Sequence, residues 1–275
     1  MEMAGSDSDI QDLALVFARA AVAAGALVMD VYQRGFAMRA KADASPVCEA
    51  DERSEYLILE RLQEACPDIP VVAEESFSRG IVPQVGRDFI LVDPLDGTRE
   101  FASRNGEFTV NVALIREGAP ACGVVYAPAF GRLWVAAGAA AYACDVAPGA
   151  DVPPLDAMRQ IRVQPLAGRS PVAAISRSHL NDETRALMTR LGAHESRGAG
   201  SALKFCHVAE GLADVYPRIG PTMEWDIAAG DAVLRAAGGV VTGLDGKPLR
   251  YGRTERGFAS PDFVAFGDQA LISRL

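Results

Sequence analysis

Apolar residues recur three or four positions apart near the start of the chain. They occupy Ile10, Leu13, Phe17, Ala20, Ala24, Leu27 and Val31. This spacing places them on one face of a helix, which should end near Gly35. A second helix is predicted from about Ala50 to Ala65, because Pro67 cannot continue it.

Short runs rich in β-branched and aromatic residues follow these two helices. They lie at Val71–Ala73, Phe89–Val92, Phe108–Ile115, Gly123–Tyr126 and Leu133–Ala136. Each is long enough for a β-strand. From Phe108 onwards the side chains alternate strictly, which predicts a half-buried strand in an antiparallel sheet.

A segment rich in proline and glycine, Ala147–Pro154, marks the one predicted boundary, between an N-terminal lobe (1–150) and a C-terminal lobe (151–275). We expect the two lobes to form one integrated unit. Strands and helices alternate in the second lobe, at Val172–Ile175, from about Asp182, at Ala202–Glu210, at Asp214–Tyr216 and from Trp225. This alternation predicts an α/β lobe whose sheet is more parallel than the first.

The composition is that of an ordinary globular protein, with 49% apolar and 23% charged residues in 275. The net charge of −9 and the absence of a basic run argue against nucleic acid as the main partner. The five cysteines are scattered and lack CxxC spacing. Thiols in a reducing cytosol therefore fit better than disulfides or a zinc site.

The N-terminus is acidic, unlike the basic start of a signal peptide. The apolar stretch Leu13–Met29 is interrupted by Arg19, and we expect it to be too short for a membrane span. It should instead be a packed amphipathic helix. The sequence thus predicts a cytoplasmic protein with no integral membrane segment.

Two carboxylates follow a buried apolar run in the middle of the first lobe. Asp93 and Asp96 lie on a turn shaped by Pro94 and Gly97, and the hydroxyl of Thr98 comes next. An Asp-Gly pair alone indicates only an ordinary turn. Two carboxylates at this spacing favour a site for Mg²⁺, which prefers oxygen ligands and keeps positions for water and phosphate.

Three motifs resemble those of the inositol monophosphatase superfamily of Mg²⁺-dependent, often lithium-sensitive phosphatases. They are Asp93–Phe101 (DPLDGTREF), Pro70–Ser76 (PVVAEES) and Trp225–Gly230 (WDIAAG). They occur in the family's order and span most of the chain. The resemblance implies an α/β (α+β) fold, a layered αβαβα sandwich of the inositol monophosphatase and fructose-bisphosphatase type, with its site between the lobes.

The resemblance also implies a set of metal ligands. Glu74, Asp93 and the main-chain carbonyl of Leu95 would hold one Mg²⁺, and Asp93, Asp96 and Asp226 a second. A third, weaker site near Glu74 would bring the total to two or three. Such cations would reconcile an acidic chain with an anionic substrate. The alternative for Asp226 is a purely structural place at a helix N-terminus.

By the same resemblance, Thr98 would orient the attacking water and Asp51 would take the proton, with Glu74 as a further catalytic group. The backbone N–H groups of Gly97 and Thr98 would bind phosphate. Cys48 stands where many relatives carry threonine. The alternative for Asp51 is a solvated side chain in the first turn of a helix.

Four other segments resemble a bacterial branch of the superfamily, the CysQ-type 3′(2′),5′-bisphosphate nucleotidases. They are Arg104–Asn111, Ser201–Cys206, Ala209–Arg218 and Gly220–Asp226. This implies an enzyme of sulfur metabolism that converts adenosine 3′,5′-bisphosphate, a phosphorylated nucleotide, to AMP. For some relatives a place at the cytoplasmic face of the inner membrane is known, and a homodimer is a further expectation.

The substrate contacts expected from this resemblance form three groups. Around the reacting phosphate they are Glu74, Leu95, Asp96, Gly97, Thr98 and Asp226, and at other anionic groups they are Lys204 and Arg218. Near the nucleoside they are Ser201 and the segment Ser176–His179, above all Ser178 and His179. Arg218 can alternatively form a surface ion pair, and His179 can have a surface or helix-terminal place. Glu75 is expected either to support the site or to lie on the surface. Trp225 should pack in the core and position Asp226.

Two other functions stay open on the sequence. Hydrolysis of inositol-1-phosphate would use the same metal chemistry. A non-catalytic scaffold that binds RNA or transcription proteins is the other alternative, and the complete carboxylate set and acidic charge argue against it.

Overall fold

The computed structural model describes residues 7–36, 39–40, 46–47, 49–177 and 180–275. Its helices are α1 (Asp7–Arg34), α2 (Glu49–Ala65), α3 (Glu74–Ser78), α4 (Thr98–Ala102), α5 (Asp182–Leu191), α6 (Leu203–Ala209) and α7 (Glu224–Ala236). Single 3-10 turns lie at Leu155–Ala157, Thr254–Arg256 and Gln269–Arg274.

The first sheet has seven strands in the order β3-β4-β5-β6-β7-β8-β9. Only β3 and β4 pair in parallel, and the other neighbours are antiparallel. The strands are β3 (Val71–Ala73), β4 (Asp88–Asp96), β5 (Thr109–Arg116), β6 (Ala119–Ala127), β7 (Arg132–Ala137), β8 (Ala140–Asp145) and β9 (Arg159–Ile161). A small hairpin joins β1 (Arg39–Ala40) to β2 (Pro46–Val47).

The second sheet has five strands in the order β11-β10-β12-β14-β13. They are β10 (Val172–Ile175), β11 (Glu195–Gly198), β12 (Val215–Arg218), β13 (Val240–Gly243) and β14 (Phe263–Phe266). Pairing is parallel among β11, β10 and β12 and antiparallel among β12, β14 and β13. The predicted parallel character therefore holds for one half of this sheet.

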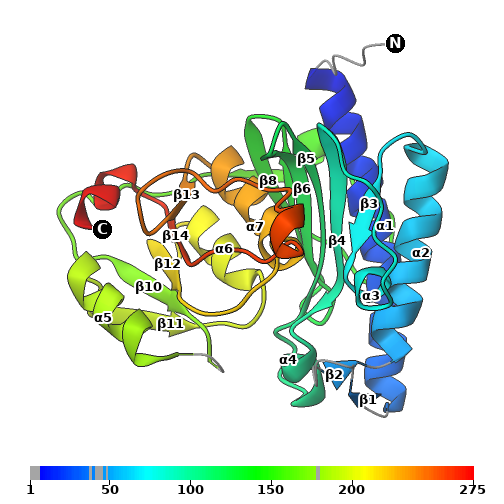
Figure 1. Cartoon of the computed structure of the whole chain (residues 1–275), viewed down its shortest axis with the longest axis horizontal. Coiled ribbons are helices and arrows are strands. Elements are labelled where there is room, and N and C mark those ends of the chain that lie inside the picture. The colour runs from blue at the N-terminus through cyan, green and yellow to red at the C-terminus, as the bar shows by residue number, and fades with distance from the viewer. Residues whose placement is uncertain (1–6, 37–38, 41–45, 48, 178–179) are drawn as a thin grey trace.

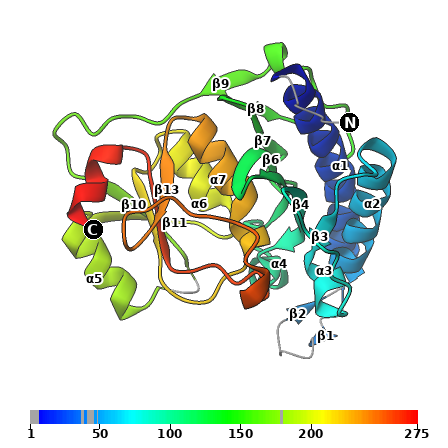
Figure 2. The ribbon, with the colours of Figure 1, turned by 45° about the horizontal axis from the view of Figure 1, so that its top comes forward.

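The elements stack in five layers, as the family resemblance implied. Helices α1 and α2 cover the outer face of the first sheet, α6 and α7 lie between the sheets, and α5 covers the second sheet (Figures 1 and 2). The expected αβαβα sandwich is thus confirmed. The first sheet includes β9, which lies beyond residue 150, so the division of the chain at that point stays a prediction.

Strand β5 differs from its prediction. Residues 109–115 are all buried, although the alternating pattern predicted a half-buried strand. The reason is that α1 packs near one face of the strand and α7 near the other. The polar side chains of Thr109 and Asn111 therefore lie inside the protein, at 0% and 1% exposure.

Helix α1 ends at Arg34, as the apolar pattern predicted. By length and composition alone its residues Ser8–Arg34 could cross a membrane, so the prediction that this stretch is too short was wrong. However, 56% of its most apolar window is buried inside the protein, with Phe17 and Val28 fully enclosed. This packing agrees with the predicted amphipathic core helix.

Candidate active site

A β-bulge in β4 brings the two predicted carboxylates to one side of the sheet. Asp93 pairs with Asn111 and Asp96 with Thr109, and the register shifts between the two pairs. In a regular strand, residues three positions apart point to opposite faces. Because Asn111 and Thr109 are only two apart, the extra residue in β4 lets Asp93 and Asp96 share a face.

Two helix N-termini complete an acidic cluster at this bulge. Glu74 opens α3 directly after β3, the parallel neighbour of β4, and Asp226 lies in the first turn of α7. Oxygens of Glu74, Asp93 and Asp226 lie within 4.8 Å of one another. The structure thus brings together residues that are 152 positions apart in the chain, from 74 to 226.

The electrostatics of the cluster fit a bound cation. Asp93 is 1% exposed, and burial, followed by the charges of Glu74, Asp96 and Asp226, raises its pKa well above the ordinary value. Burial and the neighbouring Asp96 and Glu74 raise the pKa of Asp226 to about 7. Buried carboxylates that repel one another are stabilised by a divalent cation, and an all-oxygen donor set suits Mg²⁺.

Local hydrogen bonds fix the orientation of each carboxylate. Asp93 Oδ1 accepts from the N–H of Leu95 at 3.0 Å. Asp226 Oδ2 accepts from Thr222 Oγ1 at 2.7 Å and from the N–H of Met223 at 2.9 Å, as a capping residue does. These contacts leave other carboxylate lone pairs for a ligand.

Glu55 on α2 is a supporting residue that the sequence interpretation missed. It is 1% exposed and accepts hydrogen bonds from the N–H of Glu75 at 2.6 Å and from Ser76 Oγ at 2.7 Å. It thereby fixes the first turn of α3, which carries Glu74. Glu75 itself is 4% exposed, so the surface alternative for it was wrong. Only the contact between α2 and α3 identifies Glu55 as a supporting residue. In the sequence alone it looks like any glutamate on a helix.

Asp51 lies on the first turn of α2 and is 2% exposed, so the solvated alternative was wrong. Ser54, one turn later, donates a hydrogen bond to the carbonyl oxygen of Pro94 at 3.2 Å. The start of α2 therefore packs against the bulge of β4. Thr98 begins α4 and lines the cleft described next. The proton transfer between Asp51 and Thr98 stays a prediction.

The acidic cluster lies in a cleft of about 290 Å³. Among the predicted residues, those that line it are Glu74, Asp93, Leu95, Asp96, Gly97, Thr98, Ser201, Lys204, Arg218 and Asp226. Ser176, from the segment expected near the nucleoside, also lines it. The sequence interpretation did not include Arg99, Glu100, Phe205, Tyr216, Thr222 and Ile227, which line it as well. Ser178, His179 and Cys48 lie outside the described residues.

The turn at Gly97 closely approaches Ser201, which lies two residues before α6. Gly97 has φ +91°, and a Cβ atom there would lie 2.7 Å from Ser201 Oγ. Ser201 Oγ in turn donates to the carbonyl oxygen of Asp96 at 2.5 Å. Glycine is needed at 97 for both its conformation and this close approach.

The predicted basic residues Lys204 and Arg218 line the same cleft as the acidic cluster. Lys204 is 4% exposed and donates to the carbonyl of Ser201 at 2.6 Å, and burial lowers its pKa to about 8 although Asp96 acts in the opposite direction. Arg218 donates to the carbonyl of Pro221 at 2.7 Å, whereas its buried Nε has no hydrogen-bond partner among the described residues. None of the ion pairs found in the described part of the chain includes Arg218, which disfavours the surface-pair alternative.

Trp225 has the predicted packing role. It is 4% exposed and packs against the rings of Phe77, at 5.1 Å, and Phe258, at 6.4 Å. The four cysteines in the described residues, Cys66, Cys122, Cys144 and Cys206, are free thiols, as expected.

The metal-free protein should lose stability as the pH rises. The folded state raises the pKa of Asp226 from 3.8 to about 7, so it binds more protons than the unfolded state between these values. Stability should therefore be highest near the lower value and fall as the pH passes through about 7. Melting temperatures measured in EDTA across this window would test this. A melting temperature that rises with pH would contradict it, and saturating Mg²⁺ should largely remove the decline.

Comparisons with known proteins agree with this geometry. The model of the "Inositol monophosphatase family" matches residues 9–270. The 3′(2′),5′-bisphosphate nucleotidase CysQ of Salmonella typhimurium is 45% identical over 87% of this chain and 94% of its own. The CysQ of Escherichia coli K12 is 44% identical over the same shares.

Among solved structures, CysQ from Bacteroides thetaiotaomicron superposes with a TM-score of 0.78 and 36% identity, covering 93% of this chain and 97% of the other. An inositol monophosphatase from Anabaena follows the same fold, with a TM-score of 0.72 and 27% identity over 97% and 94% of the two chains. The match of fold, motifs and nearly the full length places this chain in the inositol monophosphatase family.

Proposed function

We propose that this protein is a Mg²⁺-dependent phosphatase that removes the 3′-phosphate of adenosine 3′,5′-bisphosphate to give AMP and phosphate. The observation that carries the proposal is the cluster of Glu74, Asp93 and Asp226, with Asp93 buried, in one cleft with Lys204 and Arg218. The named CysQ relatives support the choice of substrate. A cytoplasmic location, homodimer formation and peripheral association with the inner membrane stay predictions.

We assign the metal ligands as the resemblance implied. Glu74, Asp93 and the carbonyl oxygen of Leu95 would hold one Mg²⁺, and Asp93, Asp96 and Asp226 a second, with a weaker third near Glu74. When bound, these cations neutralise phosphoryl oxygens and lower the pKa of the attacking water. A single cation is also compatible with the cluster, and metal titration by calorimetry would give the number.

The protein's own groups place the phosphate and the water. Gly97 is left-handed and lines the cleft together with Thr98. The backbone N–H groups of these two residues would bind phosphate oxygens. The hydroxyl of Thr98 would orient the attacking water. Asp51, held at the start of α2 behind the bulge, would accept the proton that Thr98 gives up.

Replacing Thr98 by valine should lower kcat by about 100-fold or more, with little change in KM, because the shape remains and the hydroxyl is lost. Asp51→Asn should have a similar effect. The double variant should lose little more than either single variant, since both changes interrupt one relay. Steady-state kinetics of the three variants would test this. Losses that multiply would show that the two residues act independently.

Lys204 and Arg218 are proposed to hold the anionic group remote from the reacting phosphate. Lys204→Met or Arg218→Met should lower kcat/KM for adenosine 3′,5′-bisphosphate by about tenfold or more, because remote contacts supply binding energy that positions the reacting group. Inositol-1-phosphate lacks that group and should be affected little. Lys247→Met, at a lysine side chain that is 82% exposed, is the control. Equal losses on both substrates would make these residues structural.

A phosphate-release panel tests the function itself. Purified protein with Mg²⁺ should hydrolyse adenosine 3′,5′-bisphosphate with a higher kcat/KM than inositol-1-phosphate or fructose-1,6-bisphosphate. Preference for inositol-1-phosphate would support the first alternative function. No hydrolysis, together with an RNA gel shift, would support the scaffold.

A further inference from the structure

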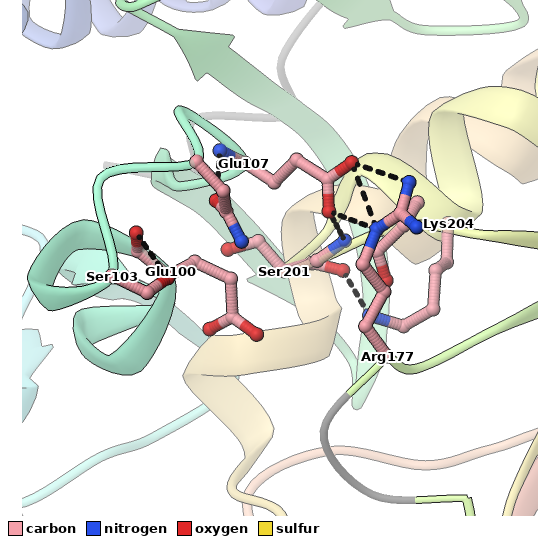
Figure 3. A network of polar contacts seen from close by, with 9 residues as sticks. Glu100, Ser103, Glu107, Arg177, Ser201 and Lys204 are labelled. Carbon is pink, nitrogen blue, oxygen red and sulfur yellow. Dashed lines mark hydrogen bonds and ion pairs between the residues drawn. The ribbon is translucent and has the colours of Figure 1, made fainter.

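The carboxylate of Glu107 joins the two lobes beside the cleft. Glu107 lies in the loop between α4 and β5, and its side chain is 15% exposed. Oε2 accepts from Arg177 Nε at 2.9 Å and from the N–H of Gly200 at 2.9 Å, while Oε1 accepts from a terminal nitrogen of Arg177 at 3.0 Å (Figure 3). One side chain of the first lobe therefore binds two separate segments of the second.

The contact at Gly200 is too close for any side chain. A Cβ atom there would lie 2.5 Å from the carbonyl oxygen of Glu107 and 2.8 Å from Glu100 Cγ. The next residue, Ser201, has φ +50° and donates to the carbonyl oxygen of Asp96. Its own carbonyl accepts from Lys204, as Figure 3 shows. The turn that carries Ser201 is thus held by Glu107 on one side and by the carbonyl of Asp96 on the other.

The contact with Arg177 fixes a second wall of the cleft. Arg177 follows Ser176, which lines the cleft with Ser201 and Lys204. The Arg177 side chain is 56% exposed, so its ion pair alone contributes little to stability. The carboxylate accepts a charge-assisted bond from a backbone N–H at the same time, which is a stronger and more directional contact. The two contacts of Glu107 should therefore matter more for the position of the segments that carry Arg177 and Gly200 than for the stability of the protein.

We propose that Glu107 is a positioning residue for substrate selection. It sets the distance between the phosphate-binding turn at residues 96–98 and the segments that carry Ser176 and Lys204. This inference rests on the proposed function, in which Lys204 contacts the remote anionic group. The carboxylates of Asp93 and Asp226 are oriented by hydrogen bonds that do not involve Glu107.

The test compares Glu107→Ala and Glu107→Gln with the wild-type enzyme on two substrates. For Glu107→Ala, kcat/KM for adenosine 3′,5′-bisphosphate should fall by about tenfold or more, mainly through KM. Its kcat/KM for inositol-1-phosphate should change by less than about twofold. Affinity for AMP, measured by calorimetry, should fall in parallel. Glu107→Gln should lose less, because its amide oxygen still accepts from Gly200, and Arg177→Ala should resemble it.

Glu117→Ala is the control, because Glu117 is 68% exposed and pairs only with Arg87 among the ion pairs of the described residues. Equal losses on both substrates, or an unchanged KM and AMP affinity, would overturn the inference. A wild-type enzyme that leaves the bisphosphate intact would overturn the proposed function, and the inference with it. If Glu107→Ala does not fold, the comparison of Glu107→Gln with Arg177→Ala decides the same question.

Discussion

Removal of divalent cations is expected to abolish phosphate release altogether. Without cations, Asp93, Asp96 and Asp226 lie beside other carboxylates. Desolvation, followed by the charges of neighbouring carboxylates, raises the pKa of each of the three. Among the described residues, the basic side chains that line the cleft are Arg99, Lys204 and Arg218. Only a cation held by the carboxylates themselves would place positive charge between them and an attacked phosphate. Dialysis against EDTA should therefore stop turnover, and added Mg²⁺ should restore it.

The same treatment should lower the melting temperature, because a ligand that binds only the folded state stabilises it. Differential scanning fluorimetry with EDTA and with Mg²⁺ would measure the shift. Ca²⁺ serves as a comparison, since it prefers more ligands and a looser geometry than Mg²⁺. Full activity after rigorous removal of metals would refute the assignment of the cluster. Sensitivity to lithium is expected from the family resemblance.

Asp93→Asn is expected to separate stability from activity. Asp93 is 1% exposed, and its carboxylate is surrounded by three others. The amide keeps the shape and can still accept the bond from Leu95. It removes a buried charge, so the metal-free variant should melt at a higher temperature than the metal-free wild type. It also removes a ligand shared by both proposed cations, so kcat should fall by about 1,000-fold or more.

The matched control is Asp88→Asn on the same strand. Asp88 lies at the other end of β4, is 28% exposed and pairs with Arg116 at 2.9 Å. This variant should keep wild-type kcat and the wild-type response to Mg²⁺. Asp93 would be a structural residue if Asp93→Asn retained activity. The same would follow if the variant in EDTA melted at a lower temperature than the wild type in EDTA.

The sequence predicted most elements because their patterns are local. The helix at 50–65 and the strands at 71–73 and 172–175 follow from periodicity and from breakers such as Pro67. Strands β8, β9, β11, β13 and β14 were not predicted, since short strands are stabilised by their neighbours rather than by their own residues. The burial of Asn111 was missed for a similar reason, because only the packing of α1 and α7 covers both faces of β5.

The candidate site divides in the same way. Asp93, Asp96 and Asp226 could be predicted because they belong to motifs of contiguous residues. Glu55 and Glu107 could not, because each acts through contacts with segments about 20 or more positions away. Spacing along the chain carries no information about such contacts. The close approach of Gly97 to Ser201 is likewise visible only in three dimensions.

The layered arrangement separates mutations that affect the reaction from mutations that affect which substrate is accepted. The carboxylates that would carry the reaction belong to the first sheet, α3 and the start of α7, whereas Ser176, Ser201, Lys204 and Arg218 come from the second sheet and the segments beside it. Drift in the second group can alter which phosphate ester is accepted while the first group is untouched. One fold can in this way give rise to enzymes that catalyse the same reaction on different substrates. Glu107 lies where the segments that carry these two groups of residues meet.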